Sequence, residues 1–296
     1  MRVLLLVILS IVVMPAFTAA PEPLSSDPAR DDEHPPAIEE LTLTSAGKRM
    51  PGHIYIANGP GPHPTVVLLH GFPGNEKNLD IAQALRRTGF NVLFFHYRGA
   101  WGAEGSYRIT RQPDDVAAVL AYLREPENAQ RLRVDPNRLS LLGHSLGGWT
   151  ALASGSRDEA VVCVGAMAPV NLGLWKAGVA ENDANAQRLL AYADSLFMLA
   201  DFDASVMRLE MDATSLEVLD TTGFGPALKG KSVLLVTGDS DPVTPADTMT
   251  VPVSEAYTEA GGMKLRTLVI SGDHSFSWSR VELARIIIDW AQADCR

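Results

Sequence analysis

One stretch of the sequence carries residues that can perform nucleophilic chemistry. Ser145 lies at the centre of Gly143-His144-Ser145-Leu146-Gly147, between a short apolar run and a series of small residues with helical spacing. This G-x-S-x-G pattern is typical of a sharp strand-to-helix turn that exposes the serine hydroxyl above a sheet. The backbone N–H of Leu146, in the first turn of the helix, is predicted to point toward negative charge that develops beside the serine oxygen. We therefore expect Ser145 to be a nucleophile and the Leu146 N–H to be an oxyanion donor.

A serine hydroxyl is a weak nucleophile at neutral pH and needs a positioned base. The chain has seven histidines, and His274 is the one that follows Ser145, as the order serine, acid, histidine of this motif requires. It lies in a Gly-Asp-His loop directly after a predicted strand. His144 adjoins the serine, but its side chain is expected to point away into the packing between strand and helix. His70 is expected to hold a loop. The sequence therefore predicts His274 as the base.

The base needs a carboxylate partner that fixes its tautomer and stabilises the imidazolium. Asp239, Asp241 and Asp273 are the nearby candidates. Asp273 adjoins His274 in the chain, which makes a good hydrogen bond to Nδ1 sterically awkward. Asp241 stands two residues further into its loop than Asp239, past the end of the preceding strand. We expect Asp241 to be the acid, with Asp239 as the alternative.

A second loop has the composition of an oxyanion loop. The segment His70-Gly71-Phe72-Pro73-Gly74 follows a continuous apolar run, which is typical of a strand buried on both faces. A glycine-containing turn at this point is where acyl-transfer enzymes place their other oxyanion donor. The Phe72 N–H is the candidate donor. An ordinary strand-to-helix loop is the alternative, but the serine motif favours the oxyanion loop.

Composition limits the classes of function. The 296 residues include 46% apolar residues, enough for a sizeable core, and the formal net charge of −10 argues against a nucleic-acid surface. No CxxC, HExxH or Cys/His cluster suggests a metal, and the chemistry needs no cofactor. Cys163 lies in an apolar, strand-like run and Cys295 is next to last, so a pair is less expected than two free thiols.

The N-terminal residues have the composition of a targeting segment. Arg2 precedes an apolar run over 3–13 and a group of small residues, which is the layout of a secretory signal peptide over 1–20. The apolar run is short for a membrane anchor. Residues 21–37 are rich in Pro, Asp, Glu and Ser and read as a disordered leader. We therefore expect an exported protein, periplasmic or secreted, with no stable membrane span after cleavage.

Strand and helix patterns alternate along the rest of the chain, which favours an α/β fold whose mostly parallel sheet has helices on both faces. The first part of this core spans 38–169 and the second part spans 231–296. No strand pattern appears between them. Residues 170–230 instead carry amphipathic helical spacing, and a connection of this length is predicted to be an inserted helical cap.

These motifs resemble those of a known family. From residue 38 to the C-terminus the chain resembles the α/β-hydrolase fold, in particular bacterial relatives of dienelactone hydrolases and serine aminopeptidases. Four motifs of this sequence match the functional motifs of that family in order. They are the oxyanion loop, the serine turn, Gly238-Asp239-Ser240-Asp241 and Gly272-Asp273-His274. The resemblance implies an eight-stranded sheet with an antiparallel second strand, a cap after the sixth strand, and Asp241 as the acid.

The expected function is an exported serine hydrolase that cleaves an ester or related acyl bond through an acyl-enzyme. The alternatives are a peptidase or amidase acting on short peptides or amides, and a non-catalytic binding protein on the same scaffold. The expected partner is a small-molecule ester, amide or peptide, and the sequence leaves the oligomeric state open. Acidic residues outnumber basic ones nine to four between residues 170 and 230, which predicts negative potential at the mouth of the site. The predicted apolar lining from the cap is Leu189, Leu196, Phe197, Leu199 and Phe202, with packing onto the core as the alternative for these side chains.

Overall fold

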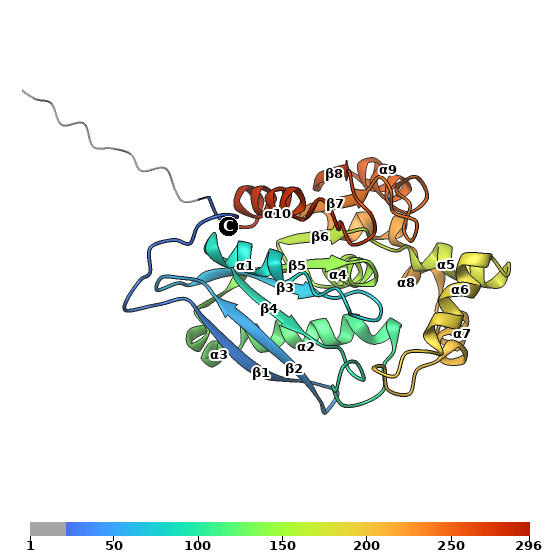
Figure 1. Ribbon diagram of the computed structural model, residues 1–296, viewed down its shortest axis with the longest axis horizontal. Coiled ribbons are helices and arrows are strands. Elements are labelled where there is room, and N and C mark those ends of the chain that lie inside the picture. The colour runs from blue at the N-terminus through green and yellow to red at the C-terminus, as the bar shows by residue number, and fades with distance from the viewer. Residues whose placement is uncertain (1–21) are drawn as a thin grey trace, which may run out of the picture.

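The computed structural model describes residues 22–296, through which runs one mixed sheet of eight strands (Figure 1). The predicted signal peptide, residues 1–20, lies outside the described residues. The strand order is β1-β2-β4-β3-β5-β6-β7-β8. β2 pairs antiparallel with β1 and β4, and the later pairs are parallel, which confirms the predicted fold class. The strands are β1 (Ala37–Ser45), β2 (Lys48–Ile56), β3 (His63–Leu69), β4 (Asn91–Phe95), β5 (Val134–His144), β6 (Cys163–Met167), β7 (Ser232–Gly238) and β8 (Lys264–Ile270).

The central strands are buried on both faces, as their continuous apolar runs predict. Successive side chains of a strand point to opposite faces, so Val67 and Leu69 of β3 join one core cluster and Val66 and Leu68 join another. The first cluster includes residues of α2 and α4, and the second includes residues of α1 and α10. The helices of the core are α1 (Leu79–Arg87), η1 (Ile109–Arg111), α2 (Gln112–Arg124), α3 (Pro126–Arg131), α4 (Leu146–Arg157), η3 (Ala246–Thr250), α9 (Val251–Ala260) and α10 (Arg280–Asp294).

The segment between β6 and β7 is helical and lies beyond the carboxyl ends of the central strands, at the right of Figure 1. A loop that follows β4 holds it by backbone hydrogen bonds. Trp101 N donates to Met198 O at 2.9 Å, and Ala200 N donates to Gly99 O at 2.7 Å. The cap is therefore attached to the core at a second place besides its two chain connections. Its elements are α5 (Leu172–Ala180), α6 (Ala184–Ala193), α7 (Ala204–Ala213), α8 (Leu216–Leu219) and η2 (Thr221–Leu228).

The predicted disordered leader makes specific contacts in the structure. Arg133 donates from Nη1 to His34 O at 2.9 Å and from Nη2 to Pro35 O at 2.8 Å. The Asn58 side chain accepts from Asp31 N at 2.8 Å. These bonds attach residues 31–35 of the leader to Asn58 and Arg133 of the core. Within 22–296, none of the helices has the length and apolar character needed to cross a bilayer.

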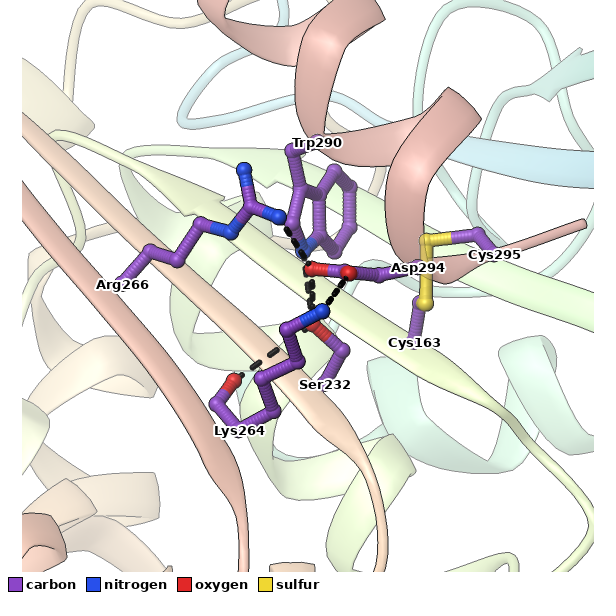
Figure 2. The surroundings of a disulfide bond; sticks show 7 residues. All are labelled: Cys163, Ser232, Lys264, Arg266, Trp290, Asp294 and Cys295. Atoms are coloured by element: carbon purple, nitrogen blue, oxygen red, sulfur yellow. Dashed lines mark hydrogen bonds and ion pairs between the residues drawn. A yellow bond between two sulfur atoms is a disulfide. The ribbon is translucent and has the colours of Figure 1, made fainter.

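Cys163 and Cys295 form a disulfide, so the prediction of two free thiols is wrong (Figure 2). Their Cα atoms lie 5.8 Å apart although 132 residues separate them in sequence. Cys163 begins β6, and α10 returns the chain end to the same face of the sheet. Asp294, which precedes Cys295, accepts from Ser232 Oγ at 3.0 Å and forms ion pairs with Lys264 and with Arg266. The disulfide and these contacts fix the last helix to β6, β7 and β8.

Candidate active site

The serine motif forms a sharp turn between β5 and α4. Ser145 has φ 58° and ψ −118°, a left-handed conformation that side chains rarely adopt. Both flanking glycines are required by contact. A Cβ at Gly143 would lie 1.8 Å from Gly147 O, and a Cβ at Gly147 would lie 2.2 Å from Leu69 O. The strain at Ser145 is held in place by this close packing, and the turn presents the hydroxyl at the carboxyl edge of the sheet.

The structure brings the predicted nucleophile, base and acid together. His274 Nε2 lies 2.9 Å from Ser145 Oγ, and His274 Nδ1 lies 2.8 Å from Asp241 Oδ2. The three side chains come from the ends of β5, β7 and β8, which lie at one edge of the parallel sheet. The Asp241 side chain is fully buried, while the His274 side chain is 19% exposed. This is the geometry in which a base can remove a serine proton while a carboxylate orients it.

The other two candidate acids face elsewhere. Asp239 Oδ1 accepts from Gly272 N at 3.1 Å, so this carboxylate joins the ends of β7 and β8. The Asp273 carboxylate accepts from Ser277 N at 2.8 Å and from Ser277 Oγ at 2.7 Å. Among the three aspartates, Asp241 is the one that contacts His274.

Asp241 is held as an anion by its surroundings. Its Oδ1 accepts from Val243 N at 2.7 Å and from Thr244 N at 2.9 Å. Burial raises the pKa of this carboxyl. The hydrogen bond and positive charge of His274, with the bonds from Thr244, outweigh burial and lower the pKa to about 2. Sequence reasoning did not identify Thr244. Its position three residues after the aspartate is the local signal, because an aspartate in a turn often bonds backbone N–H groups two and three residues on.

The two predicted oxyanion donors lie at the same cavity as the serine. Phe72 and Leu146 both line the cavity that contains Ser145 and His274. Within residues 22–296, neither backbone N–H donates a hydrogen bond to a backbone acceptor outside the regular helices and strands. Gly71 packs closely on the serine, since a Cβ there would lie 3.0 Å from Ser145 Cβ. An oxyanion donor must have no such competing acceptor, and in the described residues both N–H groups meet this requirement.

The site opens into a cavity of about 740 Å³ between the core and the cap. Apolar side chains of α5, α6 and α7 line it together with the loop after β7. The Phe72 ring packs against Tyr192 of α6 at 6.2 Å and against Phe202 at 5.8 Å, which joins the oxyanion loop to the cap. The apolar lining from the cap and its edges consists of Val170, Leu172, Leu174, Trp175, Ala186, Leu189, Tyr192 and Met207.

The predicted apolar lining is largely wrong. Of the five residues, Leu189 lines the cavity, whereas Leu196, Leu199 and Phe202 are buried in the core and Phe197 is 93% exposed. The segment after α6 is held by backbone bonds to the loop after β4, and in this position Leu199 and Phe202 pack inward while Phe197 faces solvent. Apolar character alone could not separate packing residues from lining residues.

His144 is buried, but its ring points toward the base, which corrects the predicted orientation. His144 Nε2 lies 2.7 Å from the main-chain oxygen of His274, and the two ring centroids are 4.9 Å apart. A carbonyl oxygen accepts hydrogen bonds only, so Nε2 carries the proton. His70 lies beneath the oxyanion loop and donates from Nδ1 to Gly71 O at 2.8 Å.

The model of the Alpha/beta hydrolase family matches residues 66–286, which is more than half of the chain. This chain belongs to the alpha/beta hydrolase family. The chain is similar to Esterase EstD of Thermotoga maritima, with 31% identity over 141 residues that cover 44% of this chain and 33% of that protein. It is also similar to the quorum-quenching protein AidA of Acinetobacter baumannii, with 30% identity over 136 residues that cover 44% of this chain and 43% of that protein. The chain spans about a third of the length of the first curated relatives it matches.

The solved structures show the same fold for this chain. Est1E from Butyrivibrio proteoclasticus superposes with a TM-score of 0.61 at 16% identity, over 86% of this chain and 98% of that chain. At this identity the likeness describes the fold, and the chemistry must come from the site itself.

Proposed function

We propose that this protein is an exported serine hydrolase that cleaves uncharged carboxylic esters through an acyl-enzyme. One observation carries the proposal: the hydrogen-bonded series Ser145, His274 and Asp241 opens into a largely apolar cavity of about 740 Å³. Cavities of this size and character bind small molecules. The family membership and the similarity to an esterase support the same class of reaction.

The proposed steps follow from the positions of the groups. Ser145 Oγ attacks the carbonyl carbon while His274 Nε2 takes its proton. The Phe72 and Leu146 N–H groups bind the oxyanion that forms. The tetrahedral intermediate then collapses, and His274 gives the proton to the departing alkoxide, which leaves as the alcohol. Water, deprotonated by His274, cleaves the acyl-enzyme by the same route and releases the acid. Asp241 stabilises the imidazolium in both halves.

The contacts of the acidic cap residues favour esters over substrates with a free amine. The Asp183 carboxylate accepts from Asn185 N at 2.8 Å, Asp203 accepts from Val206 N at 2.9 Å, and Asp194 accepts from Ala204 N at 2.8 Å. These carboxylates cap helices α6 and α7 or anchor the backbone between them. Asp201 likewise accepts from Ser106 Oγ at 2.7 Å. Asp194, Asp201 and Asp203 do not line the cavity, and Asp183, which does, is engaged as the N-cap of α6. A peptidase would need a carboxylate at the cavity to bind an α-amine, so these contacts support an ester substrate.

Export is supported by two independent features. The sequence of residues 1–20 predicts a signal peptide. The Cys163–Cys295 disulfide is of the kind that forms and persists in oxidising compartments, outside the reducing cytosol. Fractionation of cells expressing the full-length chain tests this proposal. Recovery of the protein in the reducing cytosol with an intact N-terminus would contradict it.

A fluorophosphonate probe tests the catalytic proposal directly. The wild-type protein should be labelled at Ser145, and Ser145→Ala should remove both labelling and ester hydrolysis while the protein still folds. A matched panel of esters, amides and aminoacyl anilides would then separate the substrate classes. Faster turnover of aminoacyl anilides than of esters would favour the peptidase. A folded wild-type protein that is neither labelled nor active would favour a binding protein.

A further inference from the structure

The residue before the nucleophile is hydrogen-bonded to the residue that carries the base. His144 is joined to Ser145 by a peptide bond, and its ring reaches across to the main-chain oxygen of His274 at 2.7 Å. The imidazole therefore spans the distance between the backbone of the nucleophile and the backbone of the base. The triad itself makes its contacts through other atoms, so this bond is an additional connection between the two loops.

His144 is placed on rigid structure. It is the last residue of β5 and pairs with Met167 of β6, and the following Ser145 N donates to Met167 O at 2.8 Å. Its own carbonyl oxygen packs on the oxyanion loop, since a Cβ at Gly71 would lie 3.0 Å from it. The backbone of one residue therefore meets the oxyanion loop, while its ring meets the base loop.

The ring has the protonation state that this contact requires. Burial, and then the positive charge of His274, lower the pKa of His144 to about 4. At neutral pH the ring is uncharged and donates from Nε2. An uncharged ring 4.9 Å from the His274 ring does not oppose formation of the imidazolium during the reaction.

We propose that His144 is a positioning residue, which sets the place of the His274 backbone relative to Ser145 Oγ. The inference rests on the proposed function. Asp241 fixes the direction of the His274 ring through Nδ1, but a ring that swings from a displaced backbone still moves its Nε2. A misplacement of about 1 Å can cost on the order of 10²-fold in rate. The His144 bond opposes that displacement at the carbonyl of the base residue.

The test compares variants that keep or remove the donor. His144→Gln can place an amide nitrogen near the position of Nε2, whereas His144→Phe fills the site without a donor and His144→Asn has an amide too short to reach the carbonyl. Active sites are counted with a fluorophosphonate, and turnover of a neutral ester is expressed per titrated site. We expect kcat per site to fall roughly 10- to 100-fold in His144→Phe and His144→Asn, with KM little changed. His144→Gln should recover most of that loss.

His63 supplies the matched control, because its Nε2 also bonds a main-chain oxygen, Gly59 O at 3.1 Å, away from the triad. His63→Phe should keep the wild-type rate per titrated site even where it lowers stability. A merely structural role of His144 would likewise reduce the number of titrated sites and leave kcat per site unchanged.

The outcomes separate the inference from the proposed function. If the wild-type protein is labelled and active but His144→Phe and His144→Asn keep its rate per site, the positioning role is wrong. If His144→Phe yields no folded protein, the comparison of Gln with Asn decides, and equal rates for these two overturn the inference. A wild-type protein without labelling or activity would overturn the serine hydrolase proposal, and the positioning role with it.

Discussion

The hydroxyl of Thr244 lies 2.6 Å from Oδ2 of Asp241, the same carboxylate oxygen that lies 2.8 Å from Nδ1 of His274. The hydroxyl also lies 3.1 Å from Ala168 O, at the end of β6. Thr244 therefore connects the acid to a neighbouring strand, and it helps to lower the pKa of the Asp241 carboxyl.

Thr244→Val should weaken the reaction without abolishing it. The substitution keeps the shape of the side chain but removes a hydrogen bond to a charged group, which is worth about 1.5–3 kcal/mol. We expect kcat/KM for a neutral ester to fall about tenfold, because Asp241 becomes a poorer partner for the imidazolium. Thr258→Val, on the exposed face of α9, is the control. Equal activity of both variants would show that the Thr244 hydroxyl has no role in the reaction.

The two loop aspartates should differ in their effect. Asp241→Asn replaces the acceptor at His274 Nδ1 and favours the wrong tautomer, so kcat should fall by something on the order of 10³–10⁴. Asp239→Asn keeps an oxygen that can accept from Gly272 N and should change kcat by less than about tenfold. Steady-state kinetics of the two variants, with folding checked by circular dichroism, measure this difference. A larger loss in Asp239→Asn would reverse the assignment of the acid.

The parts of this structure that follow chain order were predictable from the sequence. The serine turn, the loops of Asp241 and His274 and the alternation of strands and helices are local patterns, and the motif supplies their order. The disulfide and the direction of the His144 ring depend on contacts between segments about 130 residues apart. Such contacts leave no periodic signal. In the cap, Phe197 and Leu199 have similar hydrophobicity, but one is exposed and the other is buried.

Two buried histidines should make the protein less stable in mild acid. Burial lowers the pKa of His70 and of His144 from the ordinary 6.5 to about 4. Between these values the unfolded chain binds protons that the folded protein does not. The free energy of unfolding should therefore fall as the pH is lowered from about 6.5 to about 4, by up to about 1.4 kcal/mol per pH unit for each histidine.

Urea unfolding at about pH 7, 6 and 5 measures this slope. His144→Gln removes one of the two titrating rings. The part of the pH slope of the unfolding free energy that the two histidines supply should therefore fall by about half. An unfolding free energy that stays constant over this range would show that the two rings remain accessible to protons in the folded state.

Removing the disulfide should lower stability and leave catalysis unchanged. Cys163 lies at the first residue of β6, at the opposite end of the sheet from the serine turn, and its bond to Cys295 spans 132 residues. The double variant Cys163→Ser, Cys295→Ser should lose about 2–5 kcal/mol of unfolding free energy. Its kcat per titrated site at low temperature should match that of the wild type. Thiol titration of the unfolded, unreduced protein should find no free thiol, and two free thiols would contradict the disulfide.

The last prediction concerns substrate charge, and the structure changes its basis. The composition of residues 170–230 predicts a negative mouth, but six of its nine acidic side chains accept hydrogen bonds that cap helices or anchor loops. These six are Asp183, Asp194, Asp201, Asp203, Glu210 and Asp220. Within the described residues, the charged side chains of the cap that line the cavity are one acid, Asp183, and one base, Arg188. Local charge at the mouth is thus nearly balanced, and the remaining field comes from the net charge of −10.

A neutral short- to medium-chain ester should therefore outperform a coenzyme A thioester of the same acyl group, and the ratio of their kcat/KM values should shrink between about 0.02 M and about 0.5 M NaCl. Arg188→Gln removes the positive charge at the mouth and should increase the preference for the neutral substrate. Arg157→Gln, in the last turn of α4, changes the net charge equally but lies away from the cavity, so it should increase the ratio less. If the two variants change the ratio equally, the preference for the neutral ester comes from the net charge of the protein and not from Arg188 at the mouth. A preference of the wild type for the anionic thioester at low salt would contradict the prediction, because the field of the protein would then not govern substrate choice.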